Sequence, residues 1–266
     1  MRTKNTDYSV FLLVCIALLV LVVAGGVFFY SFSGTTALEE GNERVISTIF
    51  IFENNEKPLC SYVVLYCPET RRASVFDVSG DIGRIIKKIN RVDRIDTVYD
   101  SKNPDSYISE IENLLDVEIT YSAVFDLVSL GKVVDLFDGV TISIPQPIEI
   151  FDGNDLVLFP AGRITLDGDK TRNYLSYENE ESDIEAPRQR RERFFIGFLN
   201  KLSEKNDFIK RRDVAGVFRN LIRTNIKGRV SSGLLDELAK IDTDRTSIQT
   251  VGGNYREVSG KQLLIP

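Results

Sequence analysis

Apolar residues are distributed in two different ways along this chain. Tyr8 to Phe32 form one run without a charged side chain, whereas the apolar positions after about residue 45 come in short segments between polar turns. A helix that crosses a membrane needs about 20 consecutive apolar residues, and the apolar core of a cleaved signal peptide usually has only about 7–15. The pattern therefore predicts a transmembrane helix over 8–33, an N-terminal stretch at 1–7 and a polar linker at 34–44.

Charges on both sides of the apolar run predict its orientation. Arg2 and Lys4 precede it, and Glu39 and Glu40 follow it. Because Lys and Arg accumulate on the cytoplasmic side of membrane spans, the N-terminus is expected in the cytoplasm. Residues 45–266 are then expected to be the extracytoplasmic (periplasmic) domain of a single-pass protein of the cell membrane.

Segments rich in β-branched and aromatic residues predict the strands of this domain. They lie at 45–52, 59–66, 73–78, 118–125 and 140–145, and the tail from 246 to 266 is expected to form two more around a turn. The first three follow one another with short polar connections, so an antiparallel start to the sheet is expected. Residues 146–165 show no regular period and are expected to be irregular.

Apolar residues at helical spacing predict the helices. These cover 81–90, 103–116, 126–137, 166–178, 185–204, 210–226 and 231–241. Four isoleucines carry the pattern in the first of these, and Asn103 and Asp126 are the candidate N-caps of the next two. Since strands and helices follow one another without an internal linker, the sequence predicts one α/β domain at 45–266, with a central mixed β-sheet flanked by helices.

Composition narrows the possible chemistry. The 266 residues carry a net charge of -6, which argues against a nucleic-acid partner, and they include no histidine. Nucleophilic catalysis by Ser/His or Cys/His pairs and histidine-ligated zinc are therefore excluded. Cys60 and Cys67 stand at opposite ends of one expected strand, more than about 20 Å apart, so no disulfide can join them. The chemistry that remains depends on carboxylates, arginines, lysines, hydroxyl groups, thiols or a hard metal ion.

The stretch "EAPRQRRERFF" concentrates positive charge at the start of the helix expected over 185–204. Arg188 and Arg191 are three residues apart and share a face of its first turn, with Arg190 on the adjoining face. Arginine pairs at a helix N-terminus suit a phosphate or another anion. The alternative is a solvated helix face on which the arginines form salt bridges with neighbouring acidic residues. The sequence leaves both interpretations open.

Several stretches together resemble the LytR-CpsA-Psr family of bacterial cell-envelope proteins. They are "LLDVEITYSAVFDLVSLGKVVDLFDGVTISIP", "FPAGRITLDGDKTRNYLSY" and "EAPRQRRERF", which are similar to a strand–helix segment, a turn with its following helix and an arginine-bearing helix start of that family. The resemblance implies a three-layer fold and a transferase that moves a glycopolymer from a polyprenyl-pyrophosphate carrier to peptidoglycan or another envelope acceptor. It also implies Mg²⁺ and a cluster of arginines at the pyrophosphate, and an apolar pocket for the lipid tail.

The same resemblance assigns the expected site residues. Arg188 and Arg191 match the arginines of the family's helix motif, and Arg190 is their neighbour in the expected pyrophosphate site. Asp81 stands for a family aspartate, and it is the expected catalytic residue and Mg²⁺ ligand. Asp77 could supply a second carboxylate to the same ion.

Other family positions are replaced in this chain. Ser61 stands where the family has a magnesium-binding aspartate, Gly80 where it has an arginine, and Ser176 and Glu178 where it has two more arginines. Because losing one charge-stabilising group typically costs a factor of about 10²–10³ in rate, several such losses leave little activity. We therefore expect a pseudoenzyme that binds a polyprenyl-phosphate-linked or anionic glycopolymer, or an envelope protein partner. The alternatives are an active Mg²⁺-dependent glycopolymer phosphotransferase with a rearranged site, and an unrelated single-pass protein.

Overall fold

The computed structural model describes residues 45–152, 155–178, 187–227, 229–258 and 260–266. The predicted N-terminal stretch, transmembrane helix and linker, which together span 1–44, lie outside the described residues. Within the described ranges, every helix is too short or too polar to cross a membrane.

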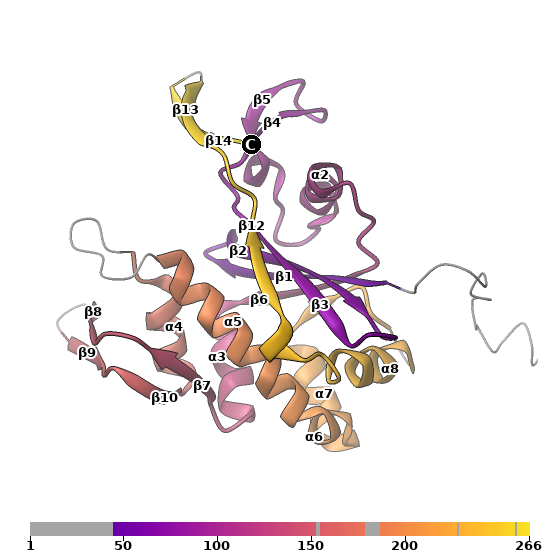
Figure 1. The fold of residues 1–266 in the computed structure, drawn as a ribbon, viewed down its shortest axis with the longest axis vertical. Coiled ribbons are helices and arrows are strands. Elements are labelled where there is room, and N and C mark those ends of the chain that lie inside the picture. Colours follow the sequence, from indigo (N-terminus) through magenta and orange to yellow (C-terminus); the bar gives the residue numbers. More distant parts are fainter. Residues whose placement is uncertain (1–44, 153–154, 179–186, 228, 259) are drawn as a thin grey trace, which may run out of the picture. The chain divides into compact units, whose positions relative to one another are not determined.

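A six-stranded mixed sheet forms the centre of the unit from residue 45 onward (Figure 1). In spatial order its strands are β11 (Arg223–Thr224), β6 (Tyr121–Asp126), β1 (Ile46–Asn54), β2 (Lys57–Cys67), β3 (Arg72–Val78) and β12 (Ser247–Thr250). The first three strands in the sequence are antiparallel neighbours, as predicted, whereas β6 pairs with β1 and β12 with β3 in parallel. The predicted central mixed sheet is therefore confirmed.

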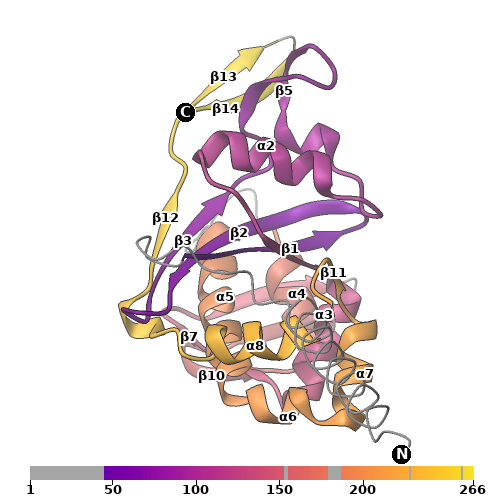
Figure 2. The ribbon, with the colours of Figure 1, turned by 90° about the vertical axis from the view of Figure 1, so that its right-hand side faces the viewer.

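Both faces of the sheet are covered, which explains why its central strands are apolar almost throughout. Along β2, Cys60 and Tyr62 face one hydrophobic cluster, while Ser61 and Val63 face the other side. Figure 2 shows α2 (Asp105–Leu115) on one side of the sheet and the remaining α-helices on the other. The result is a three-layer arrangement of helix, sheet and helices.

The helices of the second side overlap the predicted ones, except for a short helix at Asn206–Lys210 that was not predicted, and the helix predicted over 210–226 ends early. They are α3 (Leu127–Leu136), α4 (Gly168–Ser176), α5 (Pro187–Glu204), α6 (Asn206–Lys210), α7 (Arg212–Asn220) and α8 (Arg229–Leu238). The Asp126 carboxylate caps α3 as predicted, because its Oδ1 accepts a hydrogen bond from the Ser129 backbone N–H at 2.9 Å. For α2, the N-cap is Pro104 rather than the predicted Asn103.

The helix predicted over 81–90 is wrong. This segment contains strand β4 (Gly83–Ile86), which pairs with β5 (Arg91–Arg94). Ile82 and Ile86 are fully buried, but Ile85 is exposed. A spacing of four positions returns to the same side of a strand as well as of a helix, so the isoleucines could not distinguish the two structures.

Three other segments differ from the prediction. The region 146–165 is not irregular, since it forms the hairpin of β8 (Ile148–Asp152) and β9 (Asp155–Phe159) and most of β10 (Gly162–Leu166), which pairs with β7 (Val140–Ile144). The helix predicted over 210–226 breaks at Arg211, whose backbone is extended, and its end becomes β11. The tail forms three strands rather than two: β12, β13 (Asn254–Val258) and β14 (Lys261–Ile265). A short 3-10 helix, η1 (Ile95–Val98), follows β5, and a second, η2 (Thr243–Arg245), precedes β12.

Candidate functional site

The end of β3 meets the first turn of α5 through a buried carboxylate. Arg188 Nε donates to Asp77 Oδ2 at 2.7 Å and to Glu192 Oε1 at 3.0 Å. The Asp77 side chain is only 6% exposed, whereas Arg188 is half-buried. Arg188 thus bridges a carboxylate of the sheet and one of its own helix, and an anion would have to compete with both of them.

Burial dominates the electrostatics of Asp77. It raises the pKa of this carboxyl to about 6, although the Arg188 guanidinium acts in the opposite direction. The neighbouring Cys60 thiol is also affected, because burial raises its pKa to about 12. Cys60 is therefore a neutral thiol at physiological pH and not a nucleophile. Cys60 and Cys67 are both free, in agreement with the prediction for a single strand.

The other two predicted arginines have different partners. Arg191 is 12% exposed and donates to the Leu175 carbonyl at 3.1 Å, the Leu59 carbonyl at 3.3 Å and the Glu178 carboxylate at 2.9 Å. Arg190 is buried, donates to the Tyr177 carbonyl at 2.6 Å and lies over the Tyr177 ring, 5.2 Å from its centre. Acceptors of the protein itself therefore engage all three predicted arginines, including Arg188.

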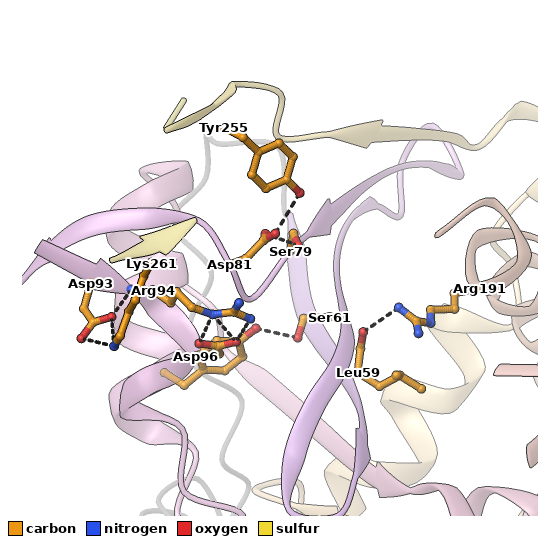
Figure 3. A network of polar contacts seen from close by, with 11 residues as sticks. Leu59, Ser61, Ser79, Asp81, Asp93, Arg94, Asp96, Arg191, Tyr255 and Lys261 are labelled. Carbon is orange, nitrogen blue, oxygen red and sulfur yellow. Dashed lines mark hydrogen bonds and ion pairs between the residues drawn. The ribbon is translucent and has the colours of Figure 1, made fainter. Parts of the chain in front are cut away.

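Asp81 lies in a separate polar group beyond the end of β3 (Figure 3). Its Oδ1 accepts a hydrogen bond from Ser79 Oγ at 2.5 Å, and its Oδ2 accepts one from Tyr255 Oη at 2.8 Å. The bond from Tyr255, which lies on β13, raises the pKa of that tyrosine. Figure 3 also shows the Arg94–Asp96 pair close to this group, whereas the guanidinium of Arg191 points to the Leu59 carbonyl.

The described residues form no preassembled carboxylate cage for a metal. No cluster of three or more Asp, Glu, Cys or His side chains occurs among them, and Asp77 is committed to Arg188. Mg²⁺ requires nearly octahedral oxygen coordination but retains several waters and uses one or two carboxylates plus phosphates. Asp81 alone could therefore hold such an ion only together with a phosphate ligand and water.

The residues that replace family positions have structural partners of their own. Ser61 Oγ lies 3.0 Å from Tyr107 Oη on the α2 side of the sheet. A Cβ atom at Gly80 would stand 2.9 Å from Asp96 Cβ, so a larger side chain does not fit without a shift. Ser176 Oγ donates to the Arg172 carbonyl at 2.8 Å. Glu178 accepts a hydrogen bond from Arg191, so each of the four residues is in contact with a neighbouring side chain or carbonyl or faces one closely.

An apolar cavity of about 480 Å³ lies between the other face of the sheet and the helices. Its lining comes from β1 and β6, from α5 to α8 and from the segment around β11, and it includes Phe50, Phe125, Phe198, Phe218 and Leu235. The family resemblance implied an apolar pocket but assigned no residue to its lining. The only signal was the apolar faces of the helices, and such faces indicate burial without distinguishing a filled core from a hollow one.

Aromatic rings fill the interior between the start of α5 and this cavity. The Phe195 ring stacks on Tyr62 with centroids 4.2 Å apart, and Phe52 lies edge-on to Phe194, Phe195 and Phe198 at about 6 Å. None of the arginines of α5 is among the described residues that line the cavity. The arginine-rich turn and the cavity are therefore separate features of the structure.

The chain is similar to teichoic acid transferases. It is 27% identical over 160 residues to TagU of Bacillus licheniformis, named polyisoprenyl-teichoic acid–peptidoglycan teichoic acid transferase, and equally similar to TagU of Bacillus subtilis. Each match covers 60% of this chain and 51% of the relative, so the chain spans about half the length of the curated relatives it matches.

Solved structures share the fold. Bacillus subtilis TagV superimposes with a TM-score of 0.72 at 14% identity and covers 85% of this chain and 92% of its own. TagT bound to LI-WTA gives a TM-score of 0.67 at 14% identity, with coverages of 87% and 88%. At these identities the likeness concerns the fold alone. A model of the LytR_cpsA_psr family matches residues 63–265, and the chain therefore belongs to the LytR-CpsA-Psr family.

Proposed function

We propose that this protein is a membrane-anchored module of the bacterial cell envelope that binds a polyprenyl-phosphate-linked glycopolymer and has weak or no catalytic activity. The observation that carries the proposal is the apolar cavity of about 480 Å³ in a domain of this family. Sites for small ligands are typically concave, apolar and about 300–1,000 Å³ in volume. The relative TagU is named for a polyisoprenyl-linked substrate, and the TagT structure holds LI-WTA, which supports a lipid-linked glycopolymer as the ligand.

The low activity is inferred from the residues around Asp77 and Asp81. Phosphoryl transfer depends on positioning and on neutralising charge, which arginines and Mg²⁺ supply. Here the buried Asp77 and Glu192 occupy Arg188, while backbone carbonyls and Glu178 occupy Arg191. The charge available to a pyrophosphate is therefore small, and Gly80 leaves no side chain to add to it.

The second candidate is an active glycopolymer phosphotransferase that joins the polymer to peptidoglycan or another envelope acceptor. It is favoured by the surroundings of Asp81, where Tyr255 donates a hydrogen bond to the carboxylate, Arg94 interacts electrostatically with Asp81, and Arg188 lies near enough to interact with the Tyr255 hydroxyl. In this arrangement Asp81 would hold Mg²⁺ together with the pyrophosphate, and Arg188 and Arg191, with Arg190 behind them, would neutralise phosphate charge after exchanging their internal partners.

Calorimetry on the full chain separates the two candidates. A short prenyl pyrophosphate is titrated with and without Mg²⁺ into the wild type, Asp81→Asn and Asp105→Asn, an exposed acidic residue of α2 that serves as the control. A non-catalytic module binds the lipid equally well in all cases. An active transferase binds it more tightly with Mg²⁺, and only Asp81→Asn loses the gain. If the wild type binds no prenyl pyrophosphate under any condition, both candidates fail.

A further inference from the structure

The hairpin of β8 and β9 presents large apolar side chains to solvent. Phe151 is 70% exposed, Leu156 is 54% exposed and Leu158 is 55% exposed. Phe151 pairs across the hairpin with Leu156, and the next pair on the same side of the strands joins Leu158 to Glu149. These four side chains share one face, which we call the outer hairpin face. It combines three adjacent apolar residues with the exposed Glu149 at one end.

The opposite face of the same hairpin belongs to the core. Ile150 is 3% exposed and Phe159 is fully buried, and the Phe159 ring lies 5.4 Å from that of Tyr174 in α4. These contacts attach the hairpin firmly to the domain. An antiparallel hairpin with one face on the core usually carries polar residues on the other face. Because adjacent exposed apolar side chains are typical of surfaces that contact a protein or a membrane, the outer hairpin face requires an occupant.

The size of this face favours a membrane over a second protein. Two paired strands of five residues each cover roughly 17 × 10 Å, or about 170 Å², as the rise per residue and the spacing of strands require. A stable protein interface buries about 800 Å² on each partner. A bilayer needs no matching surface, because each apolar side chain that enters it leaves water independently of the others.

We propose that the outer hairpin face inserts into the surface of the bilayer that carries the anchor expected at 8–33. The inference rests on the proposed function for that anchor and goes beyond it by assigning a membrane-contact surface. The expected linker at 34–44 spans at most about 40 Å, which is comparable with the width of a domain of this size, so the hairpin is able to reach the bilayer. Since the anchor keeps the domain close to the membrane, insertion of only three side chains is sufficient.

This contact depends on apolar burial and not on charge. Neither of the two strands contains a lysine or an arginine in its described residues, and Glu149 has the same sign of charge as anionic lipids. Basic side chains are what attract a protein surface to such lipids. The outer hairpin face should therefore insert into a bilayer of neutral lipid.

Tryptophan fluorescence tests the proposal, because the chain contains no tryptophan of its own. The full chain is reconstituted into phosphatidylcholine liposomes with and without bromine on the acyl chains. We expect Phe151→Trp to give a blue-shifted emission that brominated lipid quenches. Ile85→Trp is the matched control, since Ile85 is also 70% exposed and lies on the hairpin of β4 and β5, which Figure 1 shows on the other side of the central sheet. Its emission should be that of a tryptophan in water and should not be quenched.

Three other results would overturn the proposal. Equal quenching of both variants would show a general attraction of tryptophan to lipid. A blue shift of Phe151→Trp without quenching would show that a protein, such as a second copy, covers the face. Emission from water at both positions would leave the face exposed.

An alkaline wash of the liposomes separates the inference from the proposed function. If the wash removes the protein, the anchor at 8–33 is wrong, and the proposed membrane-anchored module fails with it. Quenching of Phe151→Trp before the wash decides the hairpin contact independently: its presence supports the contact even without an anchor, and its absence rejects the contact even if the anchor holds.

Discussion

Ser61 Oγ lies 3.0 Å from Tyr107 Oη in the interior between the central sheet and α2. Neither side chain is accessible to solvent, and the Tyr107 hydroxyl is kept neutral because burial raises its pKa. The position at which the family resemblance places a magnesium-binding aspartate is therefore part of the packing in this chain. Tyr107 belongs to a buried cluster that is formed mainly by isoleucines and valines.

Restoring the aspartate should damage the fold. We expect Ser61→Asp to lower the free energy of unfolding by roughly 2–4 kcal/mol at pH 7, because the buried site disfavours the charged carboxylate. The loss should shrink at pH 4, where the carboxyl is protonated. Urea denaturation at both pH values measures this, and Ser61→Ala, which removes one hydrogen bond, should cost about 1 kcal/mol. Equal stabilities of the two variants at pH 7 would contradict this explanation.

Asp77 should make stability depend on pH in the direction opposite to that of an ordinary paired carboxylate. Its pKa is raised to about 6 in the folded state, mainly by burial, so between about pH 4 and 6 the folded chain binds more protons than the unfolded chain. The resulting stabilisation of the folded state, up to roughly 3 kcal/mol, is fully present below about pH 4 and is lost as the pH rises through 6. Asp77→Asn should remove that pH dependence. The free energies of unfolding of the wild type and of Asp77→Asn, measured between pH 4.5 and 7.5, check this prediction. If the two proteins show the same pH dependence, Asp77 is not its cause.

Gly80 should tolerate no side chain while Asp96 is present. An added Cβ would stand 2.9 Å from both Asp96 Cβ and Asp96 Oδ2, and Asp96 is held by Arg94. We expect Gly80→Ala to destabilise the protein by about 1–3 kcal/mol through this overlap. In the Asp96→Gly background the same substitution should cost less than half as much, which a double-mutant cycle in urea measures. An unchanged cost would indicate that backbone flexibility, not the contact, decides the effect.

Lys261 should control the ionisation of Asp93. The buried Asp93 carboxylate accepts hydrogen bonds from Lys261, Arg91 and the Arg94 N–H, and the bond from Lys261 is the main reason that its pKa falls to about 2. This carboxylate stabilises the fold above about pH 4, and the effect is lost as the pH falls through 2.

Lys261→Met should therefore raise the pKa of Asp93 and cost about 1 kcal/mol at neutral pH, a modest value because Lys261 is half exposed. An NMR titration of the Asp93 carboxyl carbon measures the pKa. Lys240→Met, which removes a surface pair with Glu237, is the control and should leave Asp93 unchanged.

The two cavity threonines should respond in opposite directions to loss of the hydroxyl. Thr48→Val removes a buried group without a described partner and should stabilise the free protein by about 1 kcal/mol. Thr224→Val removes a hydroxyl that both donates and accepts, so it should destabilise the protein by about 1–2 kcal/mol. Thermal unfolding of both variants without lipid checks the comparison. Equal destabilisation would show that water already satisfies Thr48.

The spacing of apolar residues predicted the secondary structure well wherever it fitted only one type of element. The helix predicted over 185–204 agrees closely with α5 (Pro187–Glu204), because the spacing of its apolar residues brings them to one face only in a helix. The prediction of a helix over 81–90 failed because the spacing of Ile82 and Ile86 suits a strand equally well. The end of the helix predicted over 210–226 failed because Arg223 and Thr224 complete the edge of the sheet beside β6, which no local pattern reveals.

The site was less predictable because its partners are distant in the sequence. The position of Arg191 depends on the Leu59 carbonyl of β2, and that of Arg188 depends on Asp77 of β3. The cavity combines residues of β1, β6 and four helices, and no single segment carries its signature. Whether Arg188, Arg190 and Arg191 bind an anion, and whether Asp81 binds Mg²⁺, remain predictions.

The parallel pairing of β12 with β3 has a consequence for how the protein acquires its structure. β3 ends at Val78 and β12 begins only at Ser247, so the outer edge of β3 stays without its hydrogen-bond partner until this distant segment has reached it. Pairings between segments so distant in sequence slow folding, and an open strand edge can pair with other chains. The interval before β12 joins the sheet is therefore the stage at which we expect this edge to favour association between molecules.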